Sequence, residues 1–239
     1  MTVQHTVTLL HSSPLHLAAH GARTCWDSHD KSDSITQPVR ANEEFLYPPN
    51  LVLHETVCGS ADAELIDRVG NKFRHASILE HLNYTFYIEG ISRACLQELS
   101  RHRHTSPSVK STRYTLKELK DEDSFLDFGV PIPDMDFARA SQYLVLTDVL
   151  SVDNASIYAL ENLRLVLLDG VPNDKAKYCL PEAYKVTEQL TINARSLQNF
   201  LSLRSDKSAL WEIRQLATSL YEALPAEHQY LFTHCMKEV

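Results

Sequence analysis

Arg101, His102 and Arg103 open a short segment rich in groups that bind anions. The stretch RHRHTSPSVKSTRY, from Arg101 to Tyr114, adds hydroxyl, imidazole and further cationic groups in a chain whose formal net charge is −8. Arginine can hold a phosphate through two parallel N–H bonds, and histidine and serine add donors. The segment predicts either a solvated basic loop or a phosphate pocket, and both readings stay open. A zinc site at His102 and His104 is disfavoured, because no Cys or carboxylate lies at ligand spacing.

The segment RHASILEH, at 74–81, places His75, Ser77, Glu80 and His81 close together before an expected strand. Such groups could orient an aromatic ligand, relay a proton or, more loosely, bind a metal. They could equally end a helix by satisfying its backbone groups. The local sequence leaves these alternatives open.

The segment TINARSLQNFLSLR, at 191–204, predicts a helix with a polar and an apolar face. Arg195 and Asn199 are four residues apart and share one face, so both can reach one ligand. Arg204 ends the apolar stripe. Its guanidinium therefore either extends past the core to the helix end or lies at the edge of a dry pocket.

Glycine is too sparse to build a phosphate-binding backbone loop. No two glycines lie close enough for a dinucleotide-binding fingerprint or a P-loop. If the chain binds nucleotides, side chains such as Arg, His, Ser and Asn must supply the donors. The six glycines are at positions 21, 59, 70, 90, 129 and 170.

Composition restricts the class of protein. The 239 residues, 44% hydrophobic and 23% charged, predict one globular domain over 1–239. No apolar run approaches the roughly 18 residues of a membrane span, and the acidic balance argues against a general nucleic-acid binder. The N-terminus lacks the features of a signal peptide. Five scattered cysteines are typical of reduced thiols, so we expect a cytoplasmic protein without a membrane partner.

Apolar periodicity predicts an α+β (mixed α/β) fold in which helices dominate. Residues 27–61 lack periodicity and are expected to form a long loop with at most one short helix. Residues 106–108 are expected to form a turn, with an extended segment beginning near Ser111. Strands are expected at 3–10, 82–91 and 184–193, and helices at 14–26, 62–74, 92–101, 134–151, 154–169, 194–204 and 206–224.

Taken together, the three polar segments resemble the flavin-dependent thymidylate synthases. That family's signature is Arg-His-Arg, seven residues and Ser, which here runs from Arg101 to Ser111, with Arg113 and Tyr114 following. HxSxxEH matches at 75–81, and NARSLxNFLxLR matches at 193–204. Three ordered motifs over most of the chain make a chance match improbable. Residues 27–61 look longer than the family needs and are a candidate insertion.

The resemblance implies a fold with a small antiparallel or mixed sheet surrounded by helices. It also implies synthesis of dTMP from dUMP, with methylenetetrahydrofolate as one-carbon donor, FAD as cofactor and NADPH as reductant. A homotetramer would share its active sites between subunits. This agrees with the absence of a glycine-rich phosphate loop.

The resemblance also implies roles for individual residues. Arg204 would lie at the uracil ring, where a cation stabilises negative charge, and His75 would lie close to the flavin ring. Ser111 would act by positioning, because no partnered base is evident in the sequence. The residues expected to bind FAD are Ser77, Arg101, His102, Arg103, Asn193, Arg195 and Asn199. Those expected to bind dUMP are Glu98, Arg101, Ser111, Thr112, Arg113, Lys177 and Arg204. No metal is expected.

Four positions depart from the family pattern. Glu98 stands where the family often has Gln, with Gln97 beside it, and Lys177 replaces an Arg. Val109 removes an acidic group from the spacer, and His104 replaces a small apolar residue. These changes concern the geometry of the site rather than the reaction class. A flavoprotein of the same fold that acts on another pyrimidine nucleotide, and a nucleic-acid-binding module, are the alternative functions.

Overall fold

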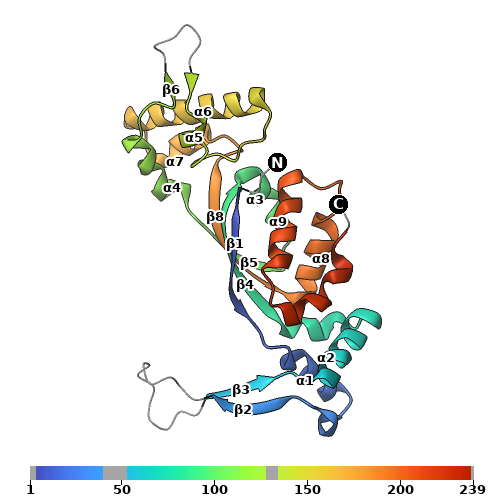
Figure 1. Ribbon diagram of the computed structural model, residues 1–239. Helices are drawn as coiled ribbons and strands as arrows, with labels where there is room; N and C mark the ends of the chain where they lie inside the picture. Colours follow the sequence, from blue (N-terminus) through green and yellow to red (C-terminus); the bar gives the residue numbers. More distant parts are fainter. Residues whose placement is uncertain (1–3, 40–52, 128–133, 238–239) are drawn as a thin grey trace.

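A four-stranded antiparallel sheet forms the centre of the computed structural model, which describes residues 4–39, 53–127 and 134–237 (Figure 1). Side chains alternate between the two faces of the sheet along the strand that contains residues 83–92: Tyr84, Phe86 and Ile88 are fully buried, whereas Tyr87 is exposed. The strands lie in the order β1 (Thr6–Ser12), β4 (Asn83–Ser92), β8 (Lys185–Asn193) and β5 (Thr105–Val109).

Helices cover the apolar face of this sheet and leave the other face polar. The main core joins the buried residues of β4 and β8 to apolar side chains of five helices. Figure 1 shows α8 and α9 side by side against the sheet, with α1 and α2 near one end of it. These helices are α1 (His16–Cys25), α2 (Ser60–Ile66), α3 (Arg93–Leu99), α8 (Ala194–Arg204) and α9 (Trp211–Glu222).

A second hydrophobic cluster lies at the opposite end of the sheet, around α6 (Leu150–Leu168). Ile157, Leu160, Leu163 and Leu167 are fully buried there and follow helical spacing. The other elements of this cluster are α4 (Thr112–Thr115), α5 (Phe137–Ala140), α7 (Asn173–Ala176), the strand pair β6 (Leu126–Asp127) and β7 (Asp134–Met135), and 3-10 turns at Leu116–Asp121 and Lys177–Cys179.

Short turns of helix complete the chain. A π-helical turn, Asp67–Lys72, continues α2, and a 3-10 turn, Ala76–His81, leads into β4. Further 3-10 turns lie at His29–Lys31, Ala226–Leu231 and Thr233–Cys235. The described residues include no helix that is both long and apolar enough to cross a membrane. The predicted fold class, α+β with a small antiparallel sheet surrounded by helices, is confirmed.

The prediction of a long loop at 27–61 is wrong for the described part of that segment. The strands β2 (Ile35–Val39) and β3 (Leu53–Val57) pair antiparallel there, and α2 begins within the segment at Ser60. Pairing between strands separated by a long connection leaves no local periodic signal, which explains the error. Residues 40–52 lie outside the described residues.

Three further predictions need correction. Residues 106–108 belong to β5 rather than to a turn. Pro107 is tolerated there because β5 is an edge strand, where the missing N–H removes no ladder bond. The segment after Ser111 is helical rather than extended. The helix predicted at 134–151 is mostly absent: among residues 134–149 only Phe137–Ala140 is α-helical.

Candidate functional site

Arg204, the last residue of α8, lies at the centre of a compact polar cluster. Its Nη1 forms an ion pair of 2.7 Å with Oε2 of Glu98, its Nη2 donates to the Glu98 carbonyl at 3.3 Å, and its Nε donates to Nε2 of His102 at 3.0 Å. The Arg204 side chain is 18% exposed. The two alternatives predicted for Arg204 are thus both partly correct. Its aliphatic chain follows the core, while α3 and the segment that follows α3 hold the guanidinium at the protein surface.

His102 is fixed on two sides. Its ring packs edge-on against buried Phe200, with centroids 4.9 Å apart. Because Arg204 donates to Nε2, that nitrogen must accept, which places the single proton of a neutral ring on Nδ1. Burial, and then the Arg204 charge, lower the pKa of His102, while Glu98 opposes this shift. The imidazole is therefore neutral near pH 7.

A pocket of about 470 Å³ opens beside this cluster. It joins the N-terminal part of α8 to the Arg-His-Arg segment and to the 3-10 turn before β4. All of its lining side chains are polar, and several are donors to oxygen. The lining residues are Glu80, His102, Arg103, His104, Asn193, Arg195, Ser196 and Asn199.

The start of α8 explains why three of these residues meet. Asn193 ends β8 and caps the helix, because its Oδ1 accepts from the Ser196 N–H at 2.8 Å. Arg195 and Asn199 then lie one turn apart on an exposed face, as predicted. The Nη1 of Arg195 contacts Glu80 Oε1 at 2.7 Å in a solvent-exposed pair.

His75 and Ser77 lie on the edge of this region rather than in the pocket lining. Both side chains are exposed, on the 3-10 turn Ala76–His81 or just before it, and this turn packs against α8. Arg101 is also exposed, beside the buried end of α3. The segment 74–81 therefore forms a turn before β4, with the side chains of His75 and Ser77 exposed.

The second group of predicted residues lies elsewhere in the chain. Ser111, Thr112 and Arg113 form the start of α4, which packs against α7, and the Arg113 carbonyl accepts from Asn173 Nδ2 at 3.0 Å. Lys177 begins the 3-10 turn that directly follows α7. Arg113 lies over the exposed ring of Tyr114, 5.5 Å from its centroid.

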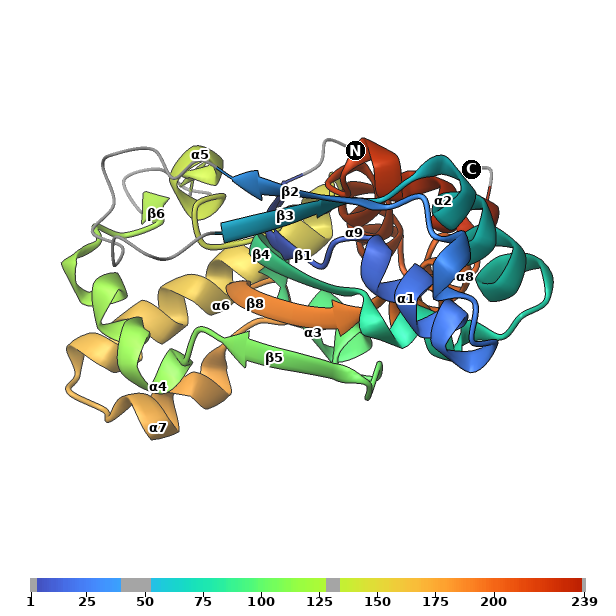
Figure 2. The same cartoon turned by 90° about the horizontal axis from the view of Figure 1, so that it is seen from below.

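The strand β5 separates the two groups. Figure 2 shows it along the edge of the sheet, with α4 and α7 at its C-terminal end. Its five residues, Thr105–Val109, span roughly 16 Å at the usual rise of an extended chain. Arg101, His102 and Arg103 precede the strand, and Ser111 follows it. One chain therefore carries two separate polar groups instead of one assembled pocket.

A second pocket, of about 440 Å³, lies between the polar face of the sheet and the α6 cluster and was not predicted from the sequence. It combines amide, hydroxyl and charged groups from five distant segments, so no local motif could reveal it. Thr112 lines this pocket. Other lining residues are Gln4, Glu89, Lys110, Glu118, Gln142, Tyr143, Tyr184 and Lys185.

Metal ligands do not gather in the described part of the chain. No group of three His, Cys, Asp or Glu side chains in residues 4–39, 53–127 and 134–237 could hold a metal ion. His75 and His81, which the sequence allowed as loose metal ligands, have no third ligand among these residues. The lining of the polar pocket presents Arg, His and Asn donors, which suit anionic and heterocyclic groups.

Comparisons with known proteins converge. The family model described as "Thymidylate synthase complementing protein" matches residues 7–228. A Campylobacter jejuni protein named flavin-dependent thymidylate synthase is 59% identical over 231 residues, covering 96% of this chain and 97% of that protein. A structure of Helicobacter pylori thymidylate synthase X with FAD and dUMP aligns with TM-score 0.83 and 47% identity, covering 98% and 100% of the two chains. A Streptomyces cacaoi UMP/dUMP methylase, 23% identical over 96% of this chain and 95% of that chain with TM-score 0.64, shares the fold.

Proposed function

The chain belongs to the family of flavin-dependent thymidylate synthases, and we propose that it makes dTMP from dUMP. In this proposal FAD is the cofactor, methylenetetrahydrofolate is the one-carbon donor and NADPH is the reductant. The observation that carries the proposal is the cluster around Arg204 and the adjoining polar pocket, which occupy the positions of the family motifs.

The residues of the pocket fit a flavin nucleotide. Arg103, Arg195 and Asn199 present donors to a diphosphate, and His102 offers an N–H at Nδ1. Arg101 and Ser77 extend the same donor set at its rim. This side-chain set replaces the glycine-rich loop that the sequence lacks. When bound, FAD would supply the redox chemistry of the reaction.

The second group fits the phosphate of dUMP. Ser111, Thr112 and Arg113 begin a helical turn and combine hydroxyl and guanidinium donors, with Lys177 on the neighbouring element. Arg204 and Arg101 would meet the pyrimidine end, with Glu98 beside them. These two parts are separated in one chain by β5, about 16 Å long. The two ends of one dUMP would therefore bind to different copies of the chain, as in a homotetramer with shared active sites.

Three residues take part in the chemistry under this proposal. The Arg204 cation would stabilise negative charge on the pyrimidine oxygens and so raise electron density at C5. His75, exposed on the turn that packs against α8, would orient the flavin ring and the folate. Ser111 would position the nucleotide through its hydroxyl and the adjoining helical turn.

The remaining parts of the proposal concern the whole protein. Residues 1–239 would act as one domain, because both hydrophobic clusters contribute elements to each complete site. The segment 27–61 would be an insertion relative to much of the family. A cytoplasmic location is supported by the five cysteines, all of them free.

Purification and turnover test the reaction. The proposal predicts a yellow protein with a flavin absorption band. Anaerobic incubation with NADPH, methylenetetrahydrofolate and dUMP should yield dTMP. Bound flavin without dTMP would favour the alternative enzyme of this fold that acts on another pyrimidine nucleotide, tested by replacing dUMP with UMP or dCMP. Tight binding of nucleic acid without flavin would favour the binding module.

Co-expression of two inactive variants tests the shared site. Arg204→Ala and Arg113→Ala each remove one half of the proposed dUMP site. If the halves come from different copies, random assembly leaves about a quarter of the sites with both native halves, and activity returns to about that level. If one chain supplied both halves, the mixture would stay as inactive as each variant alone.

A further inference from the structure

Glu98 makes two of the three contacts that hold the Arg204 guanidinium. The carboxylate Oε2 lies 2.7 Å from Nη1, and the main-chain carbonyl of the same residue accepts from Nη2 at 3.3 Å. His102 provides the third contact, at Nε. The guanidinium is thus held at both Nη atoms by Glu98, in the last turn of α3, and at Nε by the His102 imidazole.

The remaining donors of Arg204 are available to a ligand. A guanidinium has five N–H groups in a rigid plane. Three of them contact Glu98 and His102, which leaves one on Nη1 and one on Nη2 that no residue in the described ranges accepts. The side chain is buried except for 18% of its surface. Because the plane is held at three points, its orientation is fixed, and so are the directions of the two remaining N–H groups.

We propose that Glu98 is a positioning residue, which fixes Arg204 so that its two remaining N–H groups meet the pyrimidine ring of the substrate. This inference rests on the proposed function. It assigns Glu98 a role through Arg204 instead of a direct contact with the nucleotide. A carboxylate facing an anionic nucleotide would repel it, whereas one paired with Arg204 does not.

The charge of Glu98 also acts on the neighbouring imidazole, because it opposes the lowering of the His102 pKa by burial and by Arg204. Arg204 lies between the Glu98 carboxylate and a ring that accepts a hydrogen bond from it, so the three groups form one hydrogen-bonded chain from α3 to the flavin pocket. The Cys95 thiol interacts electrostatically with Glu212 and Glu188 as well as with Arg204 and Glu98. Of these, Glu212 is engaged by the Ser92 hydroxyl and its N–H.

Gln97 does not replace the glutamine that the family often has at position 98. Its side chain points to another partner, because Nε2 donates to Glu182 Oε2 at 2.8 Å on the exposed side of α3. Gln97 therefore serves as a matched control: it is adjacent in sequence, on the same helix, and outside the Arg204 cluster.

Three variants of the full-length flavoprotein test the proposal. Glu98→Ala removes the side-chain contact, Glu98→Gln keeps an oxygen that can accept from Nη1 without the charge, and Gln97→Ala is the control. The measurements are kcat and KM for dUMP, flavin content from the absorption band, and binding of dUMP followed by the change in that band. Glu98→Ala should lower kcat about 100-fold and retain flavin, because misplacing one catalytic group has effects of this size.

Rescue by the conservative variant separates positioning from a merely structural role. Glu98→Gln should recover kcat to within about tenfold of the parent, and Gln97→Ala should match the parent. A Glu98→Ala protein with parental kcat, or a Glu98→Gln protein as slow as Glu98→Ala, would overturn the proposal. Loss of flavin in Glu98→Ala alone would contradict it as well.

The proposed function can fail separately. If the parent protein binds flavin and dUMP but forms no dTMP, the reaction is wrong. The role of Glu98 is then read from binding: Glu98→Ala should weaken dUMP binding about tenfold relative to Gln97→Ala, and Glu98→Gln should restore it. Equal affinities in all three variants would reject the positioning role.

Discussion

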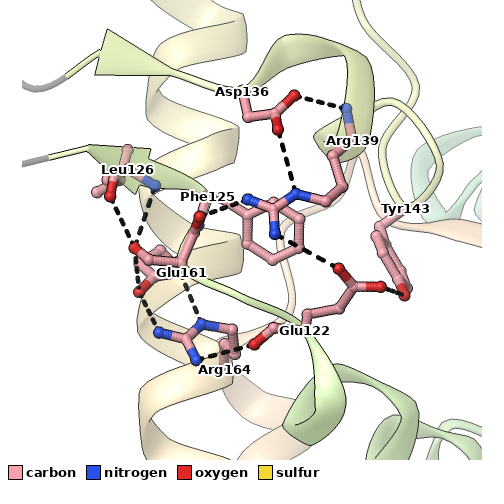
Figure 3. A network of polar contacts seen from close by, with 9 residues as sticks. Glu122, Phe125, Leu126, Asp136, Arg139, Tyr143, Glu161 and Arg164 are labelled. Carbon is pink, nitrogen blue, oxygen red and sulfur yellow. Dashed lines mark hydrogen bonds and ion pairs between the residues drawn. The ribbon is translucent and has the colours of Figure 1, made fainter.

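Two clusters, each centred on an arginine and a glutamate, differ in how completely the glutamate is bonded and buried. In the α6 cluster, Glu161 accepts from Arg164 at 2.9 and 2.7 Å, from the Ser124 hydroxyl and from the Phe125 N–H. Figure 3 shows this network extending through Glu122 to further polar groups. In the other cluster, the Glu98 carboxylate accepts from Arg204 alone among the described residues, and the Glu98 side chain is 38% exposed.

The difference indicates which cluster maintains the fold and which awaits a ligand. Burial alone would raise the pKa of Glu161, but the bonds from Arg164, Phe125 and Ser124 outweigh it and lower that pKa. A buried carboxylate that is satisfied in this way contributes to the structure. Arg204 and Glu98 are instead partly exposed beside the polar pocket, as binding of an anionic or polar ligand requires.

Arg164→Ala is expected to have the largest effect, and on stability. It leaves the Glu161 carboxylate buried, 3% exposed, without its cation, which should cost about 3–5 kcal/mol of unfolding free energy. Urea unfolding measures this loss. Glu80→Ala, which breaks the exposed pair with Arg195, is the control and should cost less than about 1 kcal/mol. Similar losses in the two variants would remove the distinction between the clusters.

Arg204→Ala should show the opposite pattern. It should lower kcat/KM for dUMP about 100- to 1000-fold, because a donor to developing negative charge is lost. Flavin content and the urea midpoint should stay close to those of the parent, since the side chain is partly exposed. Loss of flavin, or unfolding at much lower urea, would mean that this cluster maintains the fold after all.

Glu188 sharpens the comparison, because it is buried in the core yet lacks a partner for Oε2 among the described residues. Burial raises its pKa from 4.5 to about 7. The folded protein then holds a proton that the unfolded chain releases, so this stability is full below pH 4.5 and is lost as pH rises towards 7. Between pH 5 and pH 8 the parent should therefore lose roughly 2 kcal/mol of unfolding free energy through this group, and Glu188→Gln should not show that loss.

Urea unfolding of both proteins at the two pH values measures the Glu188 effect. Titration of the buried histidines is common to parent and variant, so the difference isolates one carboxyl group. A variant with the same pH dependence as the parent would show that Glu188 is ionised in the fold and has found a partner.

Asn193→Ala should lower stability less than Arg164→Ala does. It removes the cap on α8, whose Oδ1 accepts from the Ser196 N–H at 2.8 Å, and should cost about 1 kcal/mol. Asn193 also lines the polar pocket. Asn193→Asp keeps the capping oxygen but replaces the amide N–H donors with a negative charge that repels a diphosphate. It should therefore keep the stability of the parent and bind flavin more weakly than the parent. Parental flavin affinity in Asn193→Asp would confine Asn193 to the cap.

The sequence predicted well whatever depends on local periodicity. Alternation identified β4 and β8, and the spacing of Leu197, Phe200 and Arg204 identified α8. It failed where partners are distant: β2 and β3 are separated by a long connection, and β5 contains Pro107. For the site, the motifs named Arg204 and His102. The ion pair between Glu98 and Arg204 depends on the approach of the ends of α3 and α8, which no local spacing encodes.

The strand β5 constrains how this chain can vary. Ser106, Pro107 and Ser108 are exposed, so their substitution should be tolerated. Their number should not change, because residues in a strand alternate between faces and each advances the chain by about 3.3 Å. The pairing of β5 with β8 runs from Thr105 opposite Ile192 to Val109 opposite Glu188. Removing one residue would shift this register by one position. It would also turn Ser111 and Arg113 to the other side of the sheet. Deletions and insertions in this segment should therefore be far more harmful than substitutions.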